Sequence, residues 1–146
     1  MKARDGLRKG LGGLLAGAAA VAGALAVAGC LPGPTVQARN SGPLGVELYT
    51  EPDPPQVGRD AVARVRILRG AVEGVDGCEV RMRQYMPDHE MADDDRWFRL
   101  MPRAEGRYDG RTGVFSMGGH WVLEVAFRCG RRSDTLPFTI KVPWPR

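Results

Sequence analysis

The chain has 146 residues, 43% of them hydrophobic, with 21 lysines and arginines against 17 aspartates and glutamates. This length allows one domain and excludes large enzymes. Four of the basic and one of the acidic residues lie in 1–29, which leaves 17 basic and 16 acidic groups in the remainder. The later arginines alternate with apolar residues or stand beside acids: Arg64, Arg66, Arg69, Arg81 and Arg83. This pattern indicates solvated strand faces without interleaved aromatic residues, so no nucleic-acid partner is expected.

The N-terminal segment has the layout of an export signal. A basic stretch, 1–10, precedes an uncharged run of Leu, Ala, Val and Gly over 11–28. The run ends at Val27-Ala28-Gly29-Cys30, which resembles a bacterial lipobox, where small residues precede the cleaved bond and the cysteine thiol accepts the lipid. We expect 1–29 to be a lipoprotein signal peptide and Cys30 to be lipidated, with an uncleaved membrane anchor as the alternative. Both place the remainder outside the cytoplasm, in the periplasm or at the cell surface, attached to the membrane surface.

The next segment, 30–43, predicts a flexible tether. It is rich in proline, glycine and polar residues and has no apolar period with which to bury a face. The folded domain is therefore expected over 44–146. Two cysteines remain there, Cys78 and Cys129, and an even number in an oxidising compartment predicts a disulfide, with two buried free thiols as the alternative.

From residue 44 onward the dominant period is two, with turn residues every 8 to 12 positions. No long helix is expected. Seven short strands in this pattern predict an all-β, immunoglobulin-like antiparallel sandwich. The expected strands are Gly45–Thr50, Ala61–Leu68, Cys78–Met86, Trp97–Met101, one within Tyr108–Met117, Trp121–Cys129 and Thr135–Val142.

In such a sandwich the third and sixth strands are antiparallel neighbours in one sheet. A bridge between Cys78 and Cys129 would pin these strands side by side. Eight residues forward from Cys78 is Met86, and eight residues backward from Cys129 is Trp121. Both therefore fall at the same end of the sheet, about 26 Å from the disulfide at ~3.3 Å per residue.

This end gathers both histidines of the chain and several methionines. Met86, His89 and Met91 form an M-x-x-H-x-M loop, and Met117 and His120 form M-x-x-H in the next turn. Thioether and imidazole groups are neutral ligands that suit Cu(I). The alternative is that the methionines fill the core and the histidines are solvated.

Three short motifs resemble the YtkA-like domain family, and FixH-like proteins are similar more distantly. The motifs are M-P-x-H-x-M at 86–91, G-x-Y at 106–108, and F-x-M-x-G-x-W at 115–121, followed by alternating apolar residues. The resemblance covers the layout of 44–142. It implies a small extracytoplasmic immunoglobulin-like sandwich, often lipid-anchored, with a role in copper handling or the maturation of membrane metalloenzymes.

Carried over by position, the resemblance matches Met86, His89 and Met91 to the Met/His loop of the family, and Met117 and Trp121 to its second motif. This chain departs from the family pattern in its two cysteines and in the spacing between the second and third motifs.

Two functions are therefore expected of this chain. The first is transient Cu(I) binding by Met86, His89 and Met91, with Met117 or His120, close to a membrane or envelope metalloprotein that receives the ion. The alternative is a protein-interaction module of the cell envelope that uses no metal. An enzyme is not expected, because two histidines and paired cysteines leave few groups for acid–base or nucleophilic chemistry.

Overall fold

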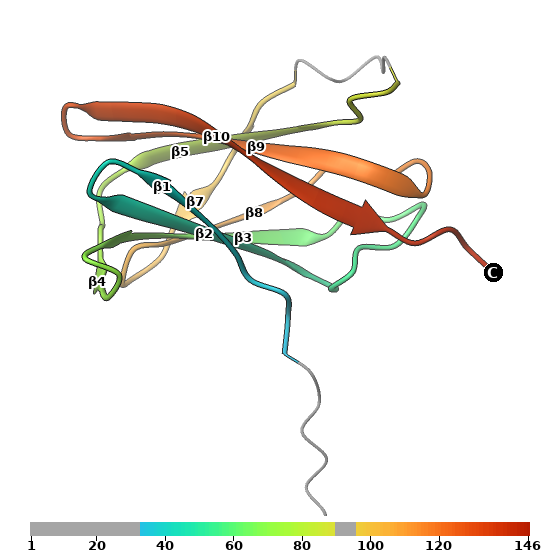
Figure 1. Cartoon of the computed structure of the whole chain (residues 1–146), viewed down its shortest axis with the longest axis horizontal. Coiled ribbons are helices and arrows are strands. Elements are labelled where there is room, and N and C mark those ends of the chain that lie inside the picture. Colours follow the sequence, from blue (N-terminus) through green and yellow to red (C-terminus); the bar gives the residue numbers. More distant parts are fainter. Residues whose placement is uncertain (1–32, 90–95) are drawn as a thin grey trace, which may run out of the picture. The chain divides into compact units, whose positions relative to one another are not determined.

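Ten β-strands and no helix make up the part of the chain that this computed structural model describes, residues 33–89 and 96–146 (Figure 1). The expected signal peptide, Cys30 and Met91 lie outside the described residues. The strands are β1 (Gln37–Ser41), β2 (Leu44–Glu51), β3 (Val62–Arg69), β4 (Glu73–Gly74), β5 (Glu79–Tyr85), β6 (Phe98–Arg99), β7 (Met101–Pro102), β8 (Arg107–Arg111), β9 (Gly119–Cys129) and β10 (Arg132–Val142).

The strands pair into two antiparallel sheets. The larger sheet has the order β1-β2-β3-β8-β7, with β4 paired to β3, and the smaller has the order β10-β9-β5-β6. If β2, β3, β5, β7, β8, β9 and β10 are read as strands A to G, the sheets contain A-B-E-D and G-F-C, as in a constant-type immunoglobulin domain. This order confirms the predicted all-β, immunoglobulin-like sandwich. Strands β1 and β4 are additional to the seven expected, and one expected strand is divided into β6 and β7.

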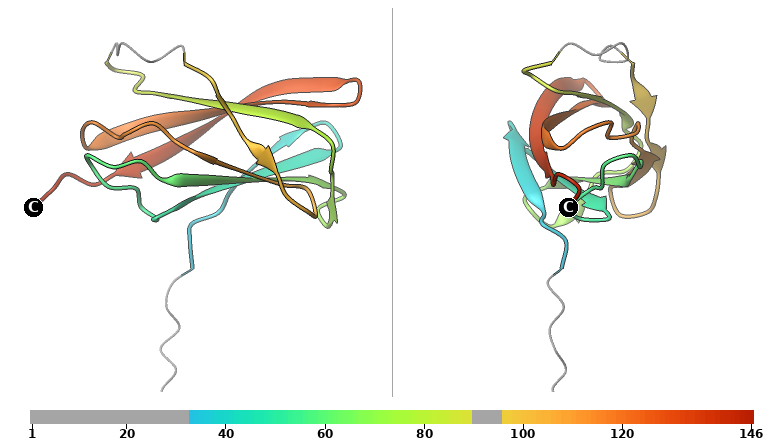
Figure 2. Two further views of the ribbon diagram at one scale, coloured as in Figure 1. Left: turned by 180° about the vertical axis from the view of Figure 1, so that it is seen from behind. Right: turned by 90° about the vertical axis from the view of Figure 1, so that its right-hand side faces the viewer.

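Strand β1 corrects the prediction that all of 30–43 is a flexible tether. It pairs along its whole length with β2. It also reaches the other sheet, because the Gln37 amide donates to the Thr139 carbonyl and the Ser41 hydroxyl donates to the Asp134 carboxylate, each at 2.6 Å. Backbone pairing with β2 and polar contacts with β10 thus hold β1 in place. For this reason the strand forms without the alternating apolar residues that would mark it in the sequence. The strand covers one open side of the sandwich (Figure 2).

The opposite side is covered by a segment that changes sheets. The strand expected over Trp97–Met101 is divided, because β6 pairs with β5 and β7 pairs with β8. Leu100 lies between them, buried in the core, and its N–H donates to the Val80 carbonyl at 3.0 Å. The backbone therefore crosses from one sheet to the other at Leu100, and the side chain of this residue packs into the core between the sheets. The strand expected within Tyr108–Met117 is also shorter, ending at Arg111.

The pairing of β5 with β9 determines where the candidate ligands lie. Cys78 and Cys129 form the predicted disulfide, with their Cα atoms 4.4 Å apart. From there the register runs from Glu79 opposite Arg128 to Tyr85 opposite Val122. Continued by one residue, it places Met86 level with Trp121, as the sequence predicted. The inward side chains of both strands belong to one core with those of the larger sheet.

Candidate functional site

Met86 directly follows β5, and its thioether lies against the backbone of β9. The side chain is only 6% exposed. A Cβ atom added to Gly119 would lie 2.8 Å from the Met86 Cε methyl. Gly119 also has a φ of +136°, which residues with a side chain rarely adopt. A glycine at the start of β9 is therefore what allows the methionine to approach this closely.

His89 is held next to Met86 by a tight turn. Pro87 has no N–H to donate and ends β5. The His89 N–H donates to the Met86 carbonyl at 3.2 Å, and the two residues form an isolated antiparallel bridge. The His89 side chain is exposed. The M-x-x-H spacing thus forms a turn that begins at a buried methionine and ends at a solvent-exposed histidine.

Met117 lies before β9 at the same end of the molecule. It is half-buried and packs against the core. Its carbonyl accepts a hydrogen bond of 3.1 Å from the indole N–H of Trp121, which is buried. The Trp121 ring in turn meets Phe115 edge to face, with 5.3 Å between ring centroids. These aromatic contacts fix the backbone that carries the second thioether, and they account for the F-x-M-x-G-x-W spacing.

Trp144, in the C-terminal segment after β10, also reaches this end and was missed in the sequence. A Cβ atom on Gly118 would lie 2.7 Å from Trp144 Cδ2, so the indole lies directly on that glycine. The side chain is nevertheless 68% exposed. In the sequence, this residue stands out only as a tryptophan between two prolines after the last strand. It lies far along the chain from the F-x-M-x-G-x-W motif, whose Gly118 it contacts.

Comparison with known proteins identifies the family of this chain. A model of the YtkA-like family matches residues 38–126, which is more than half of the chain. The chain belongs to the YtkA-like family. The matched span begins in β1 and ends in β9, so it contains every candidate ligand but neither Cys129 nor Trp144. No curated protein and no solved structure gives a match.

The YtkA-like domain brings some of the predicted ligands together and separates another. Met86 contacts Gly119, and Met117 lies two residues before that glycine and packs against the core. His120 is exposed and lies opposite Lys141 of β10. Because side chains alternate along a strand, His120 lies on the outer face of the sheet, whereas Trp121 faces the core. Met117 is therefore better placed than His120 to act with Met86.

Other metal-binding chemistry has little support in the described ranges. Within 33–89 and 96–146, no three His, Cys, Asp or Glu side chains lie close enough together to hold a metal ion. The two described cysteines are joined in the disulfide. The same ranges contain no helix long and apolar enough to span a membrane.

Proposed function

We propose that this YtkA-like protein is an extracytoplasmic lipoprotein that binds Cu(I) transiently for copper handling or metalloenzyme maturation. Met86, Met117 and His89 are the described ligands, and Met91 is a further ligand from the same loop. One observation carries the proposal: the Met86 thioether lies on Gly119 of the Gly118-Gly119 turn that Met117 precedes, while the His89 N–H is hydrogen-bonded to the Met86 carbonyl.

The ligand chemistry favours Cu(I) over other common metal ions. Thioethers and neutral imidazole are soft or borderline donors without charge, which suit Cu(I) better than Ca²⁺ or Mg²⁺. A thioether also persists in an oxidising compartment, where cysteine thiols form disulfides. The exposed His89 gives the ion a route in and out. Few ligands at an exposed loop support exchange with a recipient, as a carrier requires.

The lipid anchor has a physical role in this proposal. Acylation of Cys30 would hold the domain at a membrane surface, and residues before β1 would connect the two. A carrier held in this way meets a membrane-bound or envelope metalloprotein at high local concentration. The expected recipient is therefore a membrane or envelope metalloprotein that takes up copper outside the cytoplasm.

A Cu(I) titration of the fragment 32–146, a single compact unit, against a chromophoric chelator tests the proposal. We expect one Cu(I) per chain, with no comparable binding of Zn²⁺ or Ca²⁺. The double variant Met86→Leu/His89→Ala should lose this binding and remain folded. Met101→Leu is the matched control, because Met101 is 56% exposed on β7 and belongs to the other sheet. Unchanged affinity in the double variant would contradict the ligand assignment.

Tryptophan fluorescence gives a second test of where the ion binds. Trp144 lies on Gly118, next to Met117, whereas Trp97 lies beside β5 on the outer face. Cu(I) bound at Met86 and Met117 should quench Trp144. The variant Trp144→Phe should therefore lose part of the quenching, and Trp97→Phe should keep all of it. The reverse result would place the ion elsewhere.

A further inference from the structure

The outer face of the smaller sheet carries a row of four side chains that contains two arginines and no acid. The strand registers place Arg99 of β6 opposite Arg81 of β5, Arg81 opposite Ala126 of β9, and Ala126 opposite Thr135 of β10. Two arginines thus stand side by side on neighbouring strands. Like charges directly opposite each other destabilise a sheet unless something compensates them.

The rows on either side of this one contain their own counterions. In one row, Arg128 pairs with Glu79 at 2.5 Å. In the other row, Arg83 pairs with Glu124 at 2.5 Å. By contrast, neither Arg81 nor Arg99 forms a direct ion pair within residues 33–89 and 96–146, although Glu79 in the neighbouring row attracts both of them through space. Their charges can therefore act on an external ligand.

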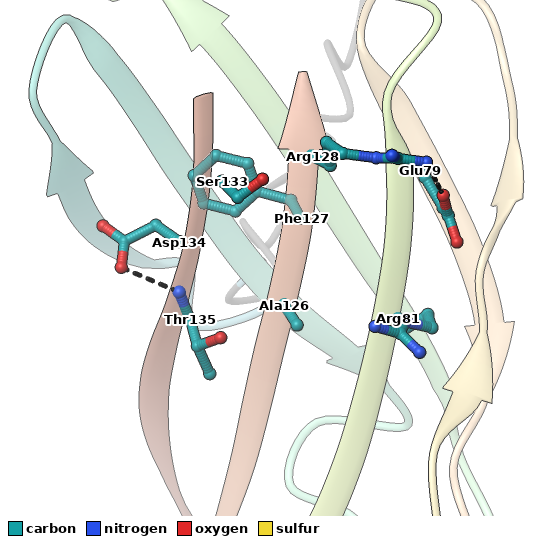
Figure 3. A pocket seen from close by; sticks show the side chains of 8 residues that line it. All are labelled: Glu79, Arg81, Ala126, Phe127, Arg128, Ser133, Asp134 and Thr135. Carbon is teal, nitrogen blue, oxygen red and sulfur yellow. Dashed lines mark hydrogen bonds and ion pairs between the residues drawn. The ribbon is translucent and has the colours of Figure 1, made fainter. Parts of the chain in front are cut away.

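A hollow lies beside Arg81, on the side of this arginine away from Arg99. Its floor is Ala126, whose side chain is the shortest in the row, and its walls include Arg81, Arg128, Ser133 and Thr135 (Figure 3). Two acids also line the hollow, and both are already engaged. Glu79 accepts a hydrogen bond from Arg128, whereas Asp134 accepts one from the Ser41 hydroxyl and one from the Thr135 N–H.

The guanidinium groups next to the hollow are ordered by aromatic rings. Arg81 and Arg83 lie 5.7 and 5.2 Å from the centroid of the Trp97 ring, and Arg83 lies 5.3 Å from that of Tyr85. For Arg81 and Arg83 this contradicts the expectation that no aromatic residues are interleaved with the arginines, whereas Arg81 is exposed to solvent as expected. The sequence did not reveal the stacking because Trp97 comes from a different segment. A stacked guanidinium keeps its N–H edge free for acceptors and loses less conformational entropy on binding.

We propose that this outer face docks an acidic segment of a partner protein, with a carboxylate entering the hollow over Ala126 and accepting hydrogen bonds from Arg81 and Arg99. Guanidinium groups bind carboxylates in a two-pronged geometry. Arginine, tryptophan and tyrosine are also the residues that contribute most to binding at protein interfaces.

The surrounding acids favour a protein segment over a polyanion. Glu79, Glu124 and Asp134 lie in or next to the arginine rows, where they would repel the closely spaced charges of a nucleic acid or an anionic membrane. Carboxylates at alternate positions of an extended segment project on one face, about 7 Å apart.

Calorimetric titration of fragment 32–146 with the peptide (Thr-Glu)₃ tests the docking surface, with (Thr-Gln)₃ as the uncharged control peptide. We expect saturable binding of (Thr-Glu)₃ alone, weakened at ~0.15 M salt. Arg81→Gln/Arg99→Gln should raise the Kd roughly tenfold, because it removes both donors to the carboxylate. Its thermal unfolding midpoint should stay unchanged or rise, since a like-charge contact is lost.

The matched control is Arg59→Gln/Arg69→Gln, which removes the same charge from two exposed arginines outside the smaller sheet. This variant should bind the peptide like the wild type. Equal weakening in both double variants would reduce the effect to net charge and overturn the proposal. So would a lack of saturable binding by the wild type. Binding to phosphatidylglycerol vesicles that depends on Arg81 and Arg99, without peptide binding, would assign the face to the membrane instead.

Discussion

Replacing Tyr108 with phenylalanine removes a single oxygen atom from the core and should cost far more than its size. The side chain is fully buried, and its hydroxyl donates to the Val75 carbonyl at 2.8 Å and accepts from the Cys78 N–H at 3.0 Å. Phenylalanine fills the same space but leaves both backbone groups without this partner. Each buried polar group left unsatisfied costs roughly 1–3 kcal/mol. Since Val75 is only partly buried, we expect a loss of about 2–4 kcal/mol in the free energy of unfolding.

Urea unfolding of the oxidised protein, followed by tryptophan fluorescence, measures this loss. Tyr49→Phe is the control, because Tyr49 is half-exposed on β2 and the same atom is removed there. Its effect should stay within about 0.5 kcal/mol, as is usual for surface positions. The reasoning would be refuted if Tyr108→Phe cost no more than Tyr49→Phe, since the hydroxyl would then satisfy no buried group.

The same residue predicts a dependence of stability on alkaline pH. Burial raises the pKa of the Tyr108 phenol, and the hydrogen bond from the Cys78 backbone opposes this rise only in part. The pKa in the folded state thus lies above that of the unfolded chain, which is near 10. The contribution of the phenol to stability is therefore complete below about pH 10 and declines as pH rises through the folded-state pKa. Urea midpoints measured across that range should fall less steeply for Tyr108→Phe than for the wild type.

Three further perturbations follow from the structure. Replacing Cys78 and Cys129 with alanine should lower the free energy of unfolding by about 4 kcal/mol, because the disulfide closes a loop between residues 51 positions apart. Urea unfolding of the reduced and the oxidised wild type should show a similar difference. Gly119→Ala should cost roughly 1–3 kcal/mol in urea unfolding, because its φ of +136° suits only glycine, and should also weaken Cu(I) binding in the chelator competition. Hydrogen bonds from the Ser41 hydroxyl and, to a smaller extent, from the Thr135 N–H hold the pKa of Asp134 below its ordinary value, so Ser41→Ala should raise this pKa. A carbon-detected NMR titration of the Asp134 carboxylate measures the change. An unchanged pKa in the variant would show that the Ser41 hydrogen bond does not act on this carboxylate.

The strands of the central sandwich could be predicted because their signals are local. Alternation of apolar and polar residues in β2, β3, β5, β9 and β10 reflects a strand with one face buried, and a period of two is visible in any such stretch. The disulfide followed from the even cysteine count, and the shared end of β5 and β9 followed from counting along two antiparallel strands. These inferences need only the chain itself and the geometry of paired strands.

Other features depend on contacts between distant segments, which no local pattern reports. Strand β1 is polar and is held by backbone pairing and by hydrogen bonds to β10. Leu100 gave no sign that the chain changes sheets around it. Likewise, the M-x-x-H motifs are local, but the contacts of Gly118 with Trp144 and of Gly119 with Met86 exist only once β5, β9 and β10 are assembled.

The sequence by itself therefore determined the fold class, the main strands and the end of the sandwich where the candidate ligands lie, because periodicity and spacing are properties of the chain. Only the tertiary structure decided which ligands face the core and which face solvent. It also placed Trp97 beneath Arg81 and set that arginine opposite Arg99 on the neighbouring strand. Packing and charge compensation are properties of neighbours in space, and those neighbours come from separate strands.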